Sequence, residues 1–143
     1  MGNEIIEKKS EQIHSLIREL REWTSADFET FDRTVTLIRS CERNLELLVE
    51  LASDINAAIV LEKQGKTPDS YKDSFLWLKK LGLLNEQLCD KLIDSVKLRN
   101  GLIHEYEFEL DNRKFYDSIK NDFIPAYAEY LQSVAKALKN ING

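Results

Sequence analysis

The chain has few of the residues that break secondary structure, with five glycines and two prolines among 143 residues. A β-sandwich or a β-barrel needs many tight turns, so this scarcity disfavours both architectures and favours long helices. Hydrophobic residues make up 43% of the chain and charged residues 31%, which is enough to bury a core and speaks against disorder. We therefore predict a single all-α domain over residues 1–143.

Cysteine is also scarce, and its positions give no sign of a disulfide framework or a metal site. Cys41 and Cys89 lie far apart, and neither has a histidine near it in the sequence. No apolar run approaches the ~20 residues of a membrane span. The first twelve residues lack the apolar segment of a signal peptide. We expect a cytoplasmic protein with reduced thiols, no membrane contact and no metal or other cofactor.

Apolar residues recur every three or four positions along most of the chain, which predicts helices. We expect five helical segments, over residues 1–25, 28–64, 69–82, 85–106 and 111–140. Thr24 to Asp27 has the form of a capping box before the second segment, and Gly65 and Gly82 are predicted helix stops. Pro125 is expected to kink the last segment. Short connections between antiparallel neighbours predict an up-and-down helical bundle.

The segment 28–64 is the longest, and its apolar residues form two stripes. A helix that is apolar on two sides is central in the fold, or it faces a core on one side and a partner on the other. Asp54 lies on the weaker stripe, between Leu51 and Ala58. A partly exposed acid is the simpler interpretation, and a carboxylate that pairs with a buried arginine is the alternative.

The segment 85–106 carries the one group of residues with catalytic potential. Arg99 falls in the middle of its apolar stripe, so it either faces an acid such as Asp54 in a structural ion pair or lines a cleft. His104 follows five residues later, which places it roughly 140° away around a regular helix. The two side chains can meet if the helix loosens at Gly101, or if two copies of the segment meet across a twofold axis. A histidine near a helix end is otherwise a surface residue or one that pairs with the helix dipole.

The order Arg99, His104, Tyr106, with the spacing Arg-x-x-x-x-His-x-Tyr, resembles the signature of HepT-like toxins, which belong to the HEPN superfamily of helical ribonucleases. Two segments before the signature, Glu50–Ile59 and Thr67–Leu84, also resemble the corresponding segments of this family. The resemblance extends from about residue 31 to residue 138.

This resemblance implies a HEPN-like bundle that forms a twofold dimer and acts as a metal-independent endoribonuclease toxin of a type VII toxin–antitoxin system. Arg99 would hold the RNA phosphate and His104 would transfer the proton. Asn100 would orient the phosphate or only cap the helix end, and Asp54 is the candidate acid beside the arginine. The family's antitoxin, an MntA-like minimal nucleotidyltransferase, would attach AMP to Tyr106 and silence the cleavage of RNA, with tRNA or mRNA as the candidate substrate.

The charge after the motif is less suited to RNA. Four acids would repel RNA unless they face away from it: Glu105, Glu107, Glu109 and Asp111. We interpret them as a solvated face, with the docking of a basic antitoxin surface as the alternative. Because the net charge is −5, contact with RNA must come from a local basic patch. The candidate residues for this patch are Arg39, Arg43, Lys91 and Lys97.

Two other functions stay open beside the enzyme. One is a non-catalytic helical subunit that binds the substrate of a nucleotidyltransferase, and the other is a plain helical interaction protein. The intact pair of Arg99 and His104 favours the enzyme, because a binding subunit has no need of it.

Overall fold

The computed structural model describes residues 2–104 and 111–142, and these two ranges consist of helices and short connections, without a β-strand. The all-α prediction is therefore confirmed for the described part of the chain. The elements follow in the order α1 (Gly2–Trp23), α2 (Phe28–Arg33), α3 (Val35–Gln64), α4 (Tyr71–Lys80), α5 (Glu86–His104), α6 (Asn112–Asp117), the π-helical segment η1 (Ser118–Phe123) and α7 (Ile124–Asn142).

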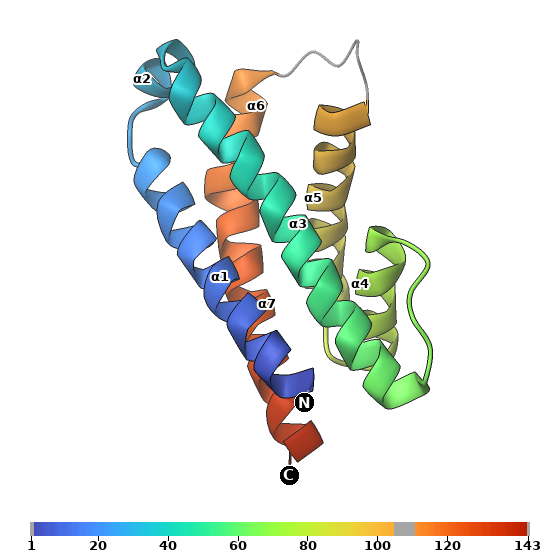
Figure 1. The fold of residues 1–143 in the computed structure, drawn as a ribbon. Helices are drawn as coiled ribbons and strands as arrows, with labels where there is room; N and C mark the ends of the chain where they lie inside the picture. Colours follow the sequence, from blue (N-terminus) through green and yellow to red (C-terminus); the bar gives the residue numbers. More distant parts are fainter. Residues whose placement is uncertain (1, 105–110, 143) are drawn as a thin grey trace.

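The four long helices α1, α3, α5 and α7 alternate in direction, which is the predicted up-and-down arrangement (Figure 1). Helix α3 contacts α1 on one side and both α4 and α5 on the other. Helix α7 packs against α1 and α5, so that it closes the bundle behind α3 (Figure 1). Of the two interpretations of the long segment, a central position in the fold is the one that these contacts support for α3.

The prediction of one continuous helix over residues 28–64 is wrong, because the helix breaks at Thr34. This residue has φ −110° and ψ 90°, outside the helical region. The ring of Phe31, fully buried, lies 6.4 Å from that of Phe115 and 5.1 Å from that of Tyr116, both in α6. The apolar spacing continues across the break, but the packing of Phe31 turns α2 toward α6 and away from the axis of α3.

The cap of α2 also differs from the predicted capping box. Asp27 is the N-cap, and its carboxylate accepts a hydrogen bond from the backbone N–H of Thr30 at 2.8 Å. This bond holds the pKa of Asp27 below its usual value. Thr24 instead donates its hydroxyl hydrogen to the carbonyl of Leu20 at the end of α1. The predicted break before the second segment is present, but another residue of the motif caps it.

The last predicted helix, over residues 111–140, is likewise not continuous. Helix α6 passes into the π-helical segment η1 and then into α7. Pro125 lies in the first turn of α7, where it has no N–H to donate and its ring crowds the carbonyl four residues earlier. The π-helical segment η1 ends at Phe123, two residues before this proline. The disturbance predicted at Pro125 therefore takes the form of a π-helical segment.

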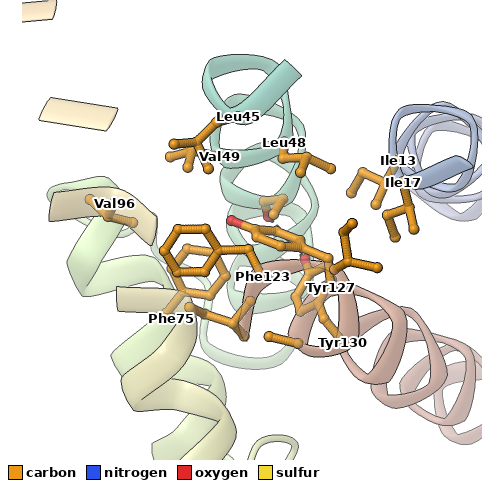
Figure 2. Close-up of a cluster of buried hydrophobic side chains, with 14 of the residues drawn as sticks. Ile13, Ile17, Leu45, Leu48, Val49, Phe75, Val96, Phe123, Tyr127 and Tyr130 are labelled. Atoms are coloured by element: carbon orange, nitrogen blue, oxygen red, sulfur yellow. Dashed lines mark hydrogen bonds between the residues drawn. The ribbon is translucent and has the colours of Figure 1, made fainter. Parts of the chain in front are cut away.

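The core contains two tyrosines whose hydroxyl groups are buried among apolar side chains (Figure 2). The hydroxyl of Tyr127 lies 2.8 Å from that of Ser95. The hydroxyl of Tyr130 lies 2.6 Å from Oδ1 of Asn56, which in turn donates from Nδ2 to the hydroxyl of Ser74 at 3.0 Å. Burial raises the pKa of both phenols, so they stay protonated. These bonds tie α7 to α3 and α3 to the first turn of α4.

Candidate active site

Helix α5 carries the motif and remains a regular α-helix through Gly101 to its end at His104. Of the two routes considered for bringing Arg99 and His104 together, the loosening at Gly101 is not observed, since this glycine is buried within the regular helix. The side chain of His104 and residues 105–110 lie outside the described part of the chain. The expectations for Tyr106 and for the three glutamates of the acidic run stay predictions for the same reason.

Arg99 is nearly buried, with a side chain 12% exposed, and three of the described residues contact its guanidinium. Nη2 lies 3.9 Å from Oε1 of Glu50 in α3. Nη1 donates a hydrogen bond to Oδ1 of Asn100 at 3.1 Å. The guanidinium carbon lies 4.8 Å from the ring centroid of Tyr71, in the range of a cation–π contact. Nε is buried and has no hydrogen-bond partner among the described residues.

The acid beside Arg99 is Glu50 and not Asp54, which corrects the predicted pairing. Oδ2 of Asp54 lies 3.0 Å from Nζ of Lys9 in α1, and the side chain of Asp54 is 58% exposed. The simpler interpretation of Asp54, a partly exposed acid, is therefore the right one. Glu50 lies one helical turn before Asp54 on the same face of α3. The periodicity of the sequence therefore identified the face of α3 that lies toward Arg99, but not which acid on that face is its neighbour.

The position of Tyr71 is set by the polar network of the core. The hydroxyl of Ser74, which Asn56 contacts, donates to the carbonyl of Tyr71 at 2.7 Å. Ser70 caps α4, because its hydroxyl accepts from the backbone N–H of Asp73 at 3.0 Å. The first turn of α4 is thus bonded to α3 through the buried pair of Asn56 and Ser74, and its N-terminus is capped by Ser70. Sequence reasoning missed Tyr71 as a neighbour of the motif arginine.

A groove of about 560 Å³ lies beside Arg99, between α3, α4 and α5. We call it the Ser53 groove. Helix α3 contributes Ser53, Asp54 and Ala57, helix α5 contributes Val96 and Asn100, and the remaining lining residues lie between Pro68 and Ser74. Asn100 both lines the groove and accepts the hydrogen bond from Arg99, so the groove begins where the guanidinium lies.

Three of the four cations predicted to be available to RNA are engaged in surface ion pairs. Lys91 lies 2.8 Å from Asp122, whose carboxylate raises the pKa of the lysine, while Arg39 and Arg43 each pair with a glutamate three residues later. Such exposed pairs are weak, so an RNA phosphate can replace them at little cost. Lys97 has no ion pair among residues 2–104 and 111–142 and is exposed on the motif helix.

The described residues also bear on metal binding, membrane contact and thiol chemistry. No group of three or more histidines, cysteines, aspartates or glutamates in the described part of the chain is placed to hold a metal ion. None of the described helices combines the length and the apolar character needed to cross a bilayer. Cys41 and Cys89 are both buried as free thiols. Burial raises the pKa of the Cys41 thiol to about 12, so this group is unsuited to nucleophilic chemistry.

Two proteins similar to this chain in sequence are named as nucleases. The family described as HepT-like ribonucleases matches residues 13–134. A tRNA nuclease HepT of Aphanizomenon flos-aquae is 27% identical over 141 residues, which are 96% of this chain and 95% of that protein. An mRNA nuclease HepT of Shewanella oneidensis is 34% identical over 110 residues, or 76% of this chain and 82% of that protein.

A solved structure has the same arrangement of helices. It is a tri-AMPylated HEPN toxin of Shewanella oneidensis in complex with an MNT antitoxin, and it superposes with a TM-score of 0.84 at 26% identity. The superposition covers 92% of this chain and 97% of the toxin chain. The resemblance inferred from the sequence is confirmed by the match over most of the chain. The protein belongs to the family of HepT-like ribonucleases.

Proposed function

We propose that this protein is the toxin of a toxin–antitoxin pair and that it cleaves RNA with Arg99 and His104. The observation that carries the proposal is Arg99 itself, a nearly buried cation held between Glu50 and the ring of Tyr71 at the edge of a groove. The described acid beside it lies 3.9 Å away, at the limit of an ion pair, which leaves the guanidinium able to bind an anion. The nuclease names of the two HepT relatives support an RNA phosphate as that anion.

The chemistry needs only the groups that the motif supplies. The 2′-OH of RNA attacks the adjacent phosphorus, the bond from phosphorus to the 5′ oxygen breaks, and a 2′,3′-cyclic phosphate and a 5′-hydroxyl result. His104 would take the proton from the 2′-OH or give one to the leaving 5′ oxygen, because imidazole titrates near neutral pH. Arg99 would bind the phosphate oxygens as negative charge builds on them. Asn100 would hold the guanidinium through its 3.1 Å hydrogen bond.

Paired variants test this assignment. Arg99→Ala and His104→Ala should each abolish RNA cleavage and relieve growth arrest while the helical content stays unchanged. Arg113→Ala, an exposed arginine on α6 that pairs with Asp117, is the matched control and should cleave normally. EDTA should have no effect, since the nucleophile belongs to the RNA and needs no metal-bound water. Undiminished cleavage by His104→Ala would refute the assignment.

The proposed active form is a twofold dimer with a composite site. Helix α5 is regular up to His104, and five residues of such a helix separate two side chains by roughly 140°. Two copies of α5 about a twofold axis can bring the arginine of one subunit to the histidine of the other. Sedimentation at micromolar concentration should therefore give twice 16.6 kDa. A monomer at that concentration contradicts both the dimer and the composite site.

The proposed control is AMPylation of Tyr106 by an MntA-like nucleotidyltransferase antitoxin. The tri-AMPylated state of the Shewanella toxin supports this proposal. Incubation with such a partner and ATP should add one or more AMP units of roughly 329 Da each, and Tyr106→Phe should take up none. The added anion and purine would block the place where RNA phosphate must lie. An adduct found on Tyr116 or Tyr127, which are both buried, would contradict the modification but not the ribonuclease.

A further inference from the structure

The Ser53 groove is continuous with the surroundings of Arg99, although the chemistry of cleavage makes no use of it. Two of its lining residues, Tyr71 and Asn100, also contact the guanidinium. A phosphate held by Arg99 would therefore lie at one end of the groove. The sugar and base attached to that phosphate must extend from this end, so the groove lies within reach of one adjacent nucleotide.

Ser53 provides a hydrogen-bonding group that the protein itself leaves unused. The residue is 6% exposed and lines the groove from α3, and its Oγ has no hydrogen-bond partner among the described residues. Buried polar atoms are nearly always paired, so an unpaired hydroxyl at a groove is a candidate ligand contact. A serine hydroxyl both donates and accepts, so it can pair with either kind of polar atom on a ligand.

The remaining lining favours a flat group of low charge over a second phosphate. Ala57 and Val96 give apolar surface. The charged lining residues are two acids, Asp54 and Asp69, against one lysine, Lys72, so the net charge of the groove opposes an anion. The volume of about 560 Å³ falls within the range of about 300–1,000 Å³ typical of small-molecule sites. Apolar surface, one unpaired hydroxyl and both donor and acceptor side chains are the features that suit a nucleobase, which has apolar faces and polar edges.

We propose that the Ser53 groove binds the base of the nucleotide next to the scissile phosphate and so determines the sequence preference of cleavage. The inference rests on the proposed ribonuclease function. Ser53 is then a specificity residue that contacts the base edge, and Asn100 connects the occupied groove with the arginine at the phosphate.

Two substitutions test the groove without touching the proposed catalytic pair. Ala57→Leu fills the groove from α3, and Ser53→Ala removes the unpaired hydroxyl while it keeps the shape. Ala128→Leu adds the same bulk to a half-buried position of α7 outside the groove and serves as the control. Cleavage sites are mapped on a random RNA library. Single-turnover rates are then measured on oligonucleotides that differ only in the base beside the preferred cut.

Wild-type protein and Ala128→Leu should prefer one base at a fixed position beside the cut. Ala57→Leu should reduce that preference at least tenfold and raise the KM, and Ser53→Ala should reduce it several-fold. The inference is wrong if both variants keep the base preference of the wild type, or if the wild type has no base preference. In either case, the observed cleavage would still support the proposed ribonuclease function. A loss of antitoxin neutralisation with unchanged preference would assign the groove to the antitoxin and overturn the inference too. Failure of every form to cleave RNA would instead refute the proposed function.

Discussion

The hydroxyl of Tyr130 is a single buried group whose removal has a calculable effect on stability. The residue is fully buried in α7, and its ring packs edge to face against Phe75 and Tyr127. Its hydroxyl lies 2.6 Å from Oδ1 of Asn56 and 3.0 Å from the carbonyl oxygen of Ala52. Tyr130→Phe keeps the ring and its packing, so the substitution removes one oxygen and nothing else.

The expected loss follows from what the substitution leaves behind. Oδ1 of Asn56 would be buried without a partner, and an unsatisfied buried acceptor costs about 1–3 kcal/mol. The free energy of unfolding should fall by about 2 kcal/mol, which for a chain of this size lowers Tm by roughly 4–8 °C. Urea unfolding followed by circular dichroism at one fixed protein concentration measures both the midpoint and the slope.

A double-mutant cycle shows whether the hydrogen bond is the cause. The double variant with Asn56→Leu and Tyr130→Phe should lose about 1 kcal/mol less stability than the sum of the two single variants. The reason is that Asn56→Leu removes the acceptor that Tyr130→Phe alone leaves unpaired. Tyr71→Phe removes the hydroxyl of a half-buried tyrosine and serves as the control, with an effect below about 0.5 kcal/mol. If Tyr130→Phe unfolds within 0.5 kcal/mol of the wild type, with an unchanged slope, the buried network is not stabilising and the reasoning fails.

Three further predictions concern single residues. Tyr71→Leu should lower kcat/KM for RNA about 2- to 30-fold, because a cation–π contact contributes about 0.5–2 kcal/mol. Tyr71→Phe keeps the ring and should stay within twofold of the wild type, and equal losses in the two variants would contradict a role for the ring face. Gly65→Ala should lower the free energy of unfolding by about 1 kcal/mol, because φ is +69° there, and Gln64→Ala should change it by less than half as much in the same urea experiment. Burial raises the pKa of Cys41 from 9.0 to about 12, so the neutral thiol stabilises the fold below pH 9 and this contribution is lost as the pH rises toward 12. The drop in urea midpoint from pH 8 to pH 10 should therefore be smaller in Cys41→Ala, and an equal drop would show that the thiol is not the cause.

Most helix ends could be predicted from the sequence, because they depend on neighbours within one or two turns. Gly65 and Gly82 have φ values of +69° and +79°, as expected for helix stops. Oδ1 of Asn85 accepts from the backbone N–H of Leu88 at 2.8 Å, as expected for a helix cap. The family was also recognisable from the sequence, because the spacing of Arg99, His104 and Tyr106 is a property of the linear chain.

The breaks inside the long predicted helices depended on residues far along the chain. Thr34 leaves the helical conformation because Phe31 packs against α6, and the apolar spacing around residue 34 contains no information about that neighbour. In the same way, the π-helical segment η1 interrupts the predicted last helix, and the apolar spacing around it does not differ from that of a regular helix. Periodicity assumes one regular helix, so it fails where packing changes the helix itself.

The neighbour of the motif arginine shows the same limit at the candidate site. The sequence by itself determined that Arg99 lies on the buried face of its helix and that an acid lies on one face of the long helix. Tertiary structure alone decided that this acid is Glu50, while Asp54 pairs with Lys9. The two acids are four residues apart, about 6 Å along the axis of α3. Sliding α5 along α3 by that distance would exchange one acid for the other while it leaves the buried face of each helix unchanged, so only the packed helices select between them.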